Sequence, residues 1–226
     1  MFRVKGGIIL TYTALQDKIL QILLILPGIL AGFTFHEYAH AYVADKLGDK
    51  TPRFQGRLSL NPLVHIDPIG FLMILIIGFG WAKPVQTNPS AYKKYYKDDL
   101  KVSLAGPVAN LILAFISAVL LVIFIKFTGT IGMNENLRWI ISRIFLLSAS
   151  INCTLFVLNL IPIPGFDGFH ILRDLFPKFF YNIADAIYRY QLIIMVLFLA
   201  SPLAHYVIGV PASYILNFIF NIVGKI

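Results

Sequence analysis

Long apolar segments separated by short polar ones dominate the chain. Four stretches contain no Asp, Glu, Lys or Arg, and they cover residues 19–36, 102–125, 144–166 and 190–224. A helix needs about 20 apolar residues to cross a bilayer, so each of the first three stretches has room for one span. The last is long enough for two, with a natural break at Ser201-Pro202. The pattern predicts membrane-spanning helices near residues 18–44, 100–126, 139–161, 179–200 and 203–223.

A fifth apolar run, from Ile69 to Trp81, is too short for an ordinary span and is typical of a re-entrant or buried segment. Before it, Arg57 to Leu60 alternates polar and apolar residues, a pattern that favours an edge strand. We therefore predict an all-α membrane protein, a polytopic bundle of about five to six transmembrane segments. A small β-strand or re-entrant region is expected after the first span.

Composition supports a membrane protein. Hydrophobic residues make up 58% of the 226 residues and charged residues only 13%, about half the usual charged share of soluble chains. This excludes a soluble enzyme, a disordered tail and a nucleic-acid-binding protein. The single cysteine, Cys153, rules out an intrachain disulfide framework and a cysteine-based zinc site.

The net charge of +8 is explained by topology. If the first span runs from outside to inside, 13 Lys and Arg residues fall on the inner side and 6 on the outer side. Inner loops of membrane proteins carry such an excess, so we expect a multi-pass protein of the cell membrane in this orientation. The orientation also requires the Ile69–Trp81 run to return to the inner side.

The inner half of the first span contains a metal-binding pattern. His36-Glu37-Tyr38-Ala39-His40 reads H-E-x-x-H, which places both imidazoles on one face of a helix. Two neutral imidazoles suit zinc, and Glu37 can act as the base toward a water beside the metal. Ionisable groups within an apolar span are costly and usually functional.

A catalytic zinc site needs a third protein ligand. We favour Asp167, because Pro162 and Pro164 open the helix before it and Gly168 follows it. His65, His170 and Asp67 are alternatives, although Asp67 precedes a proline and suits turn capping equally well. Glu135, the other glutamate, lies in the outer loop and is on the wrong side.

Taken together, these motifs resemble the site-2 protease family of intramembrane zinc metalloproteases (peptidase family M50). H-E-x-x-H is joined here to N-x-x-P-x-P-x-x-D-G, running from Asn159 to Gly168. The likeness extends over roughly residues 19 to 175 and is to the short prokaryotic branch without PDZ or CBS domains. Further matching stretches are Leu47-Gly48-Asp49, Arg57 to Pro62, His65 to Gly70, Gly80 to Val85 and Ala105 to Asn110.

The resemblance implies a function and a set of roles. His36, His40 and Asp167 would bind one catalytic Zn²⁺, Glu37 would be the general base, and Asn159 would hold the substrate carbonyl or oxyanion. The expected activity is hydrolysis of peptide bonds within or near transmembrane segments of membrane-protein substrates, in regulated intramembrane proteolysis. His65 is a possible additional active-site residue, and the family assigns no clear role to His170.

We expect a single integral-membrane peptidase domain over residues 1–226, with a core at 19–175 and additional C-terminal helices at 179–223. The active site would face the cytoplasmic side, and the partners would be transmembrane substrates and the lipid bilayer, with no nucleic acid. The sequence leaves the oligomeric state open. The alternative is a non-proteolytic membrane protein that binds or transports metal, or acts as a scaffold, through the same His and Asp residues.

Two further groups of residues have expected structural roles. Gly28 and Gly32, four residues apart, are predicted to allow helix packing or a bend. At the start of the second span, Gly106 and Pro107 are predicted to allow close helix approach. Asn110 is expected to form a hydrogen bond across helices or near the site.

Overall fold

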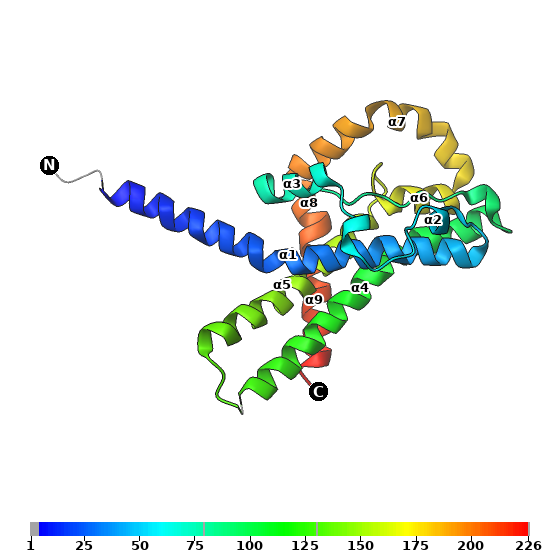
Figure 1. Cartoon of the computed structure of the whole chain (residues 1–226). Coiled ribbons are helices and arrows are strands. Elements are labelled where there is room, and N and C mark those ends of the chain that lie inside the picture. Colours follow the sequence, from blue (N-terminus) through cyan, green and yellow to red (C-terminus); the bar gives the residue numbers. More distant parts are fainter. Residues whose placement is uncertain (1–4, 79, 130, 226) are drawn as a thin grey trace.

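The computed structural model describes residues 5–78, 80–129 and 131–225, and the side chains of these residues except 5–15 and 77. Within this part, helices account for most of the chain (Figure 1). The longer ones are α1 (Lys5–Leu47), α3 (Pro68–Ile77), α4 (Tyr95–Thr128), α5 (Glu135–Asn159), α6 (Asp167–Leu175), α7 (Pro177–Ala200) and α9 (Val210–Val223). The short ones are α2 (Thr51–Phe54), α8 (Pro202–Ala204), the 3₁₀ helices Pro62–Val64 and Pro89–Ala91, and the π-helical turn η3 (His205–Gly209).

A long apolar helical segment is found at each of the five predicted spans. Helical segments long and apolar enough to cross a membrane are found at Gln16–Leu47, Tyr95–Thr128, Glu135–Asn159, Pro177–Ala200 and Pro202–Val223. Each overlaps the span predicted from the charge-free stretches. The predicted break at Ser201-Pro202 is also present, since α7 ends at Ala200 and Ser201 has extended backbone.

Helices α1, α4 and α5 pack together as the centre of the molecule. Small side chains allow this close packing, as Ala114, Ala118 and Ala149 are completely buried. A Cβ atom on Gly28 would lie 2.6 Å from the Cα of Ser148, so α1 and α5 pass each other with no room for a side chain. The predicted packing role of Gly28 is therefore confirmed.

The C-terminal helices surround this centre unequally. Helix α9 packs against α4 and α5 through Ala212, Ile219 and Val223. Helix α7 arches away at the top of Figure 1 and contacts mainly α6 and α8. Most of its apolar side chains are exposed, for example Leu192 and Leu197, as expected for a helix whose outer face is in contact with lipid.

The predicted β-strand is not found. Arg57 to Leu60 has no strand structure, and the only β-type pairing in the described part of the chain is an isolated bridge between Ile66 and Ala82. Arg57 explains the difference, because its guanidinium donates to the carbonyls of Val64, Lys83 and Pro84 and holds the segment as a folded loop.

The short apolar run forms helix α3 followed by a reversal. Asp67 caps the helix by accepting from the N–H groups of Ile69 and Gly70, and Gly78 ends it in the left-handed conformation. The returning chain passes so close that a Cβ atom on Gly70 would lie 2.2 Å from the Trp81 carbonyl oxygen. The apolar side chains Ile69, Leu72 and Ile76 of α3 are more than half exposed, so this helix is not buried in the protein.

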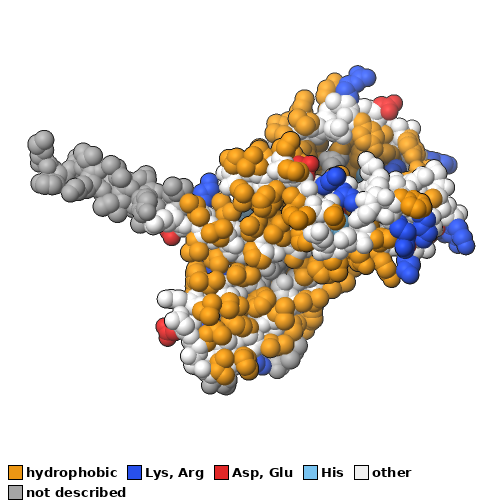
Figure 2. Space-filling view, in the orientation of Figure 1, with side chains coloured by type: hydrophobic (Ala, Val, Ile, Leu, Met, Phe, Trp, Pro, Cys, Tyr) orange, Lys and Arg blue, Asp and Glu red, His pale blue; other side chains and the backbone are white. Residues whose placement is uncertain are grey.

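Charge and apolar surface are separated along the molecule. Figure 2 shows hydrophobic side chains over most of the visible surface, including the hairpin of α4 and α5. Lys and Arg side chains gather at the end where α1 terminates and α4 begins (compare Figures 1 and 2). Lys46 lies in the last turn of α1, and Lys93, Lys94 and Lys97 are exposed around the start of α4.

Candidate metal centre

Two histidines lie on one face of α1, one turn apart. His36 and His40 are both buried, and their rings are 4.6 Å apart between centroids. The spacing of four residues in a continuous helix brings them together, as the H-E-x-x-H pattern predicts. His40 lies seven residues before the end of α1, so the pair is about 10 Å along the helix axis from the basic end of the molecule.

Asp167 reaches the histidine pair from the first residue of α6. The two prolines before it terminate α5, and Gly165, with a φ of 99°, turns the chain back. Gly168 allows the turn to pack tightly, because a Cβ atom there would lie 2.4 Å from the carbonyl oxygens of Leu160 and Ile161. The sequence Asp-Gly therefore lets the carboxylate face inward.

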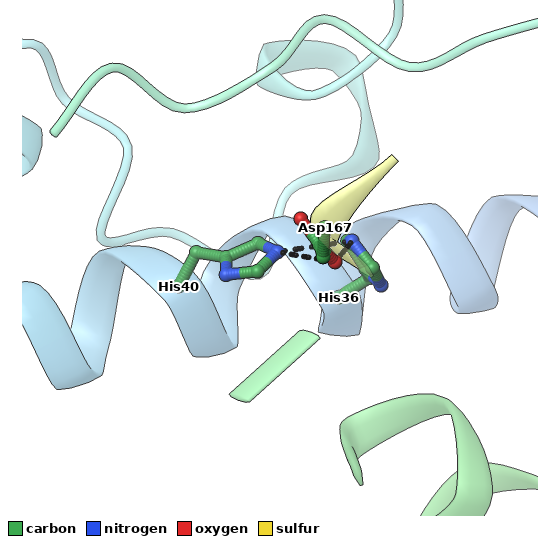
Figure 3. A group of neighbouring side chains, drawn as sticks. All are labelled: His36, His40 and Asp167. Atoms are coloured by element: carbon green, nitrogen blue, oxygen red, sulfur yellow. Dashed lines mark hydrogen bonds and ion pairs between the residues drawn. The ribbon is translucent and has the colours of Figure 1, made fainter. Parts of the chain in front are cut away.

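The three side chains converge on one point (Figure 3). Asp167 Oδ2 is 3.1 Å from His36 Nε2 and 3.3 Å from His40 Nε2, and the two Nε2 atoms are 3.0 Å apart. A tetrahedral zinc ion with bonds of about 2.0–2.1 Å holds its ligand atoms about 3.3 Å apart. Buried Asp167 Oδ2 has no hydrogen-bond partner in the part of the chain that the structure describes. The spacing and this orphaned oxygen fit a cation bound among the three atoms.

The carboxylate of Asp167 is in the form that binds metal. Burial alone would raise its pKa, but the positive charges that His40 and His36 carry when protonated outweigh burial and hold the pKa of this carboxyl well below its usual range. Asp167 is therefore ionised at neutral pH. Two imidazoles and one carboxylate are a known ligand set of catalytic zinc sites, which leaves a fourth position open.

Helix α4 fixes both imidazoles from behind. His36 Nδ1 donates to Asn110 Oδ1, and His40 Nδ1 donates to the Val102 carbonyl, each at a distance of 2.7 Å. Gly106 lies between these two positions and faces the rings directly. A Cβ atom on Gly106 would lie 2.3 Å from His40 Nε2 and 2.6 Å from His36 Cε1. The predicted close approach at Gly106 is confirmed, and it occurs at the site itself.

Glu37 is buried beside the histidines and held by the segment that returns from α3. Its Oε2 accepts the N–H of Val85 at 2.7 Å. Arg57 holds the same segment by donating to the carbonyls of Lys83 and Pro84. Burial lowers the pKa of Arg57, and the charge of Glu37 opposes this shift. The position of Glu37 thus depends on the loop region that follows α2.

Two cavities border the site from different sides. The first, of about 360 Å³, is mostly apolar, and its lining includes Phe33, Trp81, Leu155 and Met195. The second, of about 440 Å³, is lined about equally by polar and apolar groups, and its polar lining includes Asp99, Ser103, His170 and Arg173. We call them the apolar and the polar cavity. Glu37 and Asp167 line both, so the two cavities meet at these carboxylates.

Asn159, near the end of α5, lines the apolar cavity together with His36 and Glu37. Its Nδ2 donates to the Leu155 carbonyl at 3.0 Å. An amide nitrogen carries two hydrogens, so a second donor remains for a molecule in the cavity.

The alternative ligands lie outside the three-residue cluster. His65 is fully buried, and its Nε2 donates to the Ser59 carbonyl, so it stabilises the loop before α3. Asp67 is used as a helix cap. His170 lines the polar cavity, and Glu135 lies at the start of α5 beside the capping residue Asn134.

Sequence reasoning missed Asn152. This residue of α5 is fully buried, and its Oδ1 accepts from Asn110 Nδ2 at 2.9 Å. The available signal was an asparagine within an apolar span, since such residues are expensive unless they form hydrogen bonds. Two asparagines in neighbouring spans, Asn110 and Asn152, could have been paired on that ground.

Comparison with known proteins identifies relatives over most of the chain. Residues 24–203 match peptidase family M50. YwhC of Bacillus subtilis is 41% identical over 182 residues, which are 80% of this chain and 81% of YwhC. Rip2 of Mycolicibacterium smegmatis is 34% identical over 67% of this chain and 56% of its own length, and MJ0611 of Methanocaldococcus jannaschii is 32% identical over 69% and 72%. All three names assign these proteins provisionally to the zinc metalloproteases. No solved structure is significantly similar to the chain.

Proposed function

Because the chain belongs to peptidase family M50 and is a membrane zinc metalloprotease, we propose that it cleaves peptide bonds within or near transmembrane segments of other membrane proteins. One observation carries the proposal. The carboxylates of Glu37 and Asp167 lie where an apolar cavity meets a polar one. Such a position suits a substrate that arrives from lipid and a water molecule that arrives from solvent.

We assign one zinc ion to His36, His40 and Asp167, whose ligand atoms converge within 4.8 Å. Zinc at this site supplies Lewis-acid activation of water and of the scissile carbonyl. The residues 1–226 then act as one peptidase domain, with the ligands contributed by α1 and α6 and the supporting bonds by α4.

Glu37 is the general base in this mechanism. It takes a proton from the attacking water and delivers it to the leaving amine, a role that typically contributes 10²–10⁴-fold to the rate. The hydrogen bond from the Val85 N–H fixes one carboxylate oxygen. This fixes the direction in which the other oxygen can act.

Asn159 stabilises the negative charge that develops on the carbonyl oxygen of the cleaved bond. Its second Nδ2 hydrogen is available for this purpose, because the Leu155 carbonyl is the only acceptor that this nitrogen meets among the described residues. Loss of one such donor typically costs about 3 kcal/mol of transition-state stabilisation. The substrate must be unwound at the cleavage site, since the carbonyls of a helix are already hydrogen-bonded.

The site lies toward the cytoplasmic face in this proposal. His40 is near the end of α1 that carries the exposed Lys cluster, and inner loops are the basic ones. Helix α3, of 10 residues, is about 15 Å long, half of a hydrocarbon core of about 30 Å. In this proposal α3 therefore enters the membrane from the inner side with its apolar side chains exposed to lipid, and the chain returns to the same side as a re-entrant segment.

Co-expression with single-span candidate substrates tests the function. Glu37→Gln should keep zinc and lose cleavage by about 10²–10⁴-fold. Glu135→Gln is the matched control, because Glu135 is the other glutamate of the chain and lies exposed at the start of α5. If Glu37→Gln cleaves as well as the wild type, the mechanism is refuted. Zinc bound without any cleavage by the wild type would favour a metal-binding or transport protein.

A further inference from the structure

Buried asparagines connect the centre of the helix bundle to the metal ligand His36. Asn110 on α4 and Asn152 on α5 are both completely buried. Asn110 Oδ1 contacts His36 Nδ1 at 2.7 Å, and Asn110 Nδ2 contacts Asn152 Oδ1 at 2.9 Å. The three side chains form one continuous chain of hydrogen bonds across α1, α4 and α5.

The direction of these hydrogen bonds is fixed by backbone carbonyls. Asn152 Nδ2 contacts the carbonyl oxygens of Gly28 at 3.2 Å and Ser148 at 2.9 Å. Carbonyl oxygens only accept, so the NH₂ group of Asn152 must face them and its Oδ1 must face Asn110. In the same way, the Gly32 carbonyl, 3.1 Å from Asn110 Nδ2, requires the NH₂ group of Asn110 on that side.

These hydrogen bonds determine the tautomer of His36. Since Asn110 Oδ1 is an acceptor, His36 Nδ1 must carry the proton, and in a neutral imidazole the Nε2 atom then keeps its lone pair. Nε2 is the atom that faces Asp167 and His40. His40 obtains the same arrangement from the Val102 carbonyl, so only His36 depends on side chains for it.

We propose that Asn110 and Asn152 form an amide relay that fixes the tautomer and ring orientation of His36 for zinc binding. This inference rests on the proposed zinc site. Asn110 and Asn152 are positioning residues, since Asn152 acts through Asn110 and neither reaches the point where the ligand atoms converge. Gly32 belongs to the same device, because a Cβ atom there would lie 2.7 Å from Asn152 Oδ1.

Metal titration of the purified full-length protein tests the relay, with Co²⁺ as the probe and Zn²⁺ in competition. Asn110→Leu should weaken metal binding by about 10–100-fold, as for other partners of metal-ligating histidines. Asn152→Leu should weaken it by a smaller factor. Asn110→Asp, which keeps an acceptor oxygen for His36 Nδ1, should recover affinity relative to Asn110→Leu.

Thr154→Val is the matched control on α5. Its hydroxyl bonds only locally, to the Ser150 carbonyl, and the variant should bind metal like the wild type. If Asn152→Leu binds metal as tightly as Thr154→Val, the relay is refuted. If the wild type itself binds neither Co²⁺ nor Zn²⁺, the proposed zinc site fails instead.

A second measurement needs no variant of the relay. In zinc-loaded wild type labelled with [¹⁵N]histidine, the buried Nδ1–H of His36 should be protected from exchange with water. Its signal can be identified by its loss in His36→Cys, which retains a metal ligand. Absence of this protected signal in the wild type overturns the proposal, even if the asparagine variants fail to fold.

Discussion

Gly106 is the position where the smallest change should damage the metal centre most. Gly106→Ala adds one methyl group, which would lie 2.3 Å from His40 Nε2. Carbon and its neighbours pack at about 3.5 Å, so the two groups must separate by about 1.2 Å. Metal–ligand distances tolerate only about 0.2 Å. The required movement is therefore several times larger than a zinc site can absorb.

The two imidazole rings have little freedom to move away from a methyl group at Gly106. Each is held from behind by a 2.7 Å hydrogen bond to α4, the helix that carries Gly106. Moving α4 away would stretch both bonds, and moving the rings would separate them from Asp167. We expect Gly106→Ala to lose most of its zinc and to be destabilised by about 1–3 kcal/mol, the usual cost of an added methylene in a packed core.

The assay is zinc content per protein by mass spectrometry, with thermal unfolding in detergent with and without a chelator. Gly129→Ala is the matched control at the end of α4, because its Cβ would meet the nearest atom at an ordinary 3.4 Å. It should keep a full equivalent of zinc. A Gly106→Ala protein that also holds one tightly bound zinc would refute the argument from close packing.

Three further predictions concern ligands and packing. Asp167→Ala should bind no tight zinc, so zinc added to chelator-treated protein should raise the unfolding temperature of the wild type but not of this variant. At a free zinc concentration of 100 times Kd, the stabilisation of the wild type is about 2.7 kcal/mol. Equal shifts in the two proteins would show that another residue is the third ligand. Arg173→Ala should destabilise the protein by about 3–5 kcal/mol in denaturant or thermal unfolding, since it leaves the ion-pair partners Asp99 and Asp174 buried and unpaired. Lys101→Ala removes an exposed side chain that pairs with Asp98 and should cost at most about 1 kcal/mol. Similar losses of stability in both variants would contradict the burial argument. Gly28→Ala should lower stability by about 1–3 kcal/mol by forcing α1 and α5 apart at Ser148, and an unchanged unfolding temperature would show that the helices can separate freely.

The positions of the spans and the cluster of His36, His40 and Asp167 could be predicted because they depend on local rules. Charge-free length identifies a membrane helix, and a spacing of four places His36 and His40 on one face without knowledge of the fold. Asp167 could be favoured because prolines and a glycine mark where the helix opens. In each case the decisive residues are close together in the sequence.

The rest could not be predicted because it depends on contacts between distant segments. The sequence cannot show that Asn152 bonds to Asn110, or that Gly106 faces the rings, before the crossing of α1, α4 and α5 is known. The prediction of a strand at Arg57–Leu60 was wrong for a similar reason. Its alternating pattern is real, but the Arg57 side chain bonds to carbonyls more than 25 residues away and folds the segment into a loop.

The order of the ligands along the chain has a consequence for biogenesis. Both histidines and Glu37 enter the membrane with the first helix, whereas Asp167 follows His40 by 127 residues. During synthesis the two histidines therefore have no partner carboxylate from Asp167 until α4, α5 and α6 have been made. If these residues hold the zinc ion as proposed, a nascent chain has no complete metal site until its bundle is nearly finished, because Asp167 meets the histidines only when α6 reaches α1.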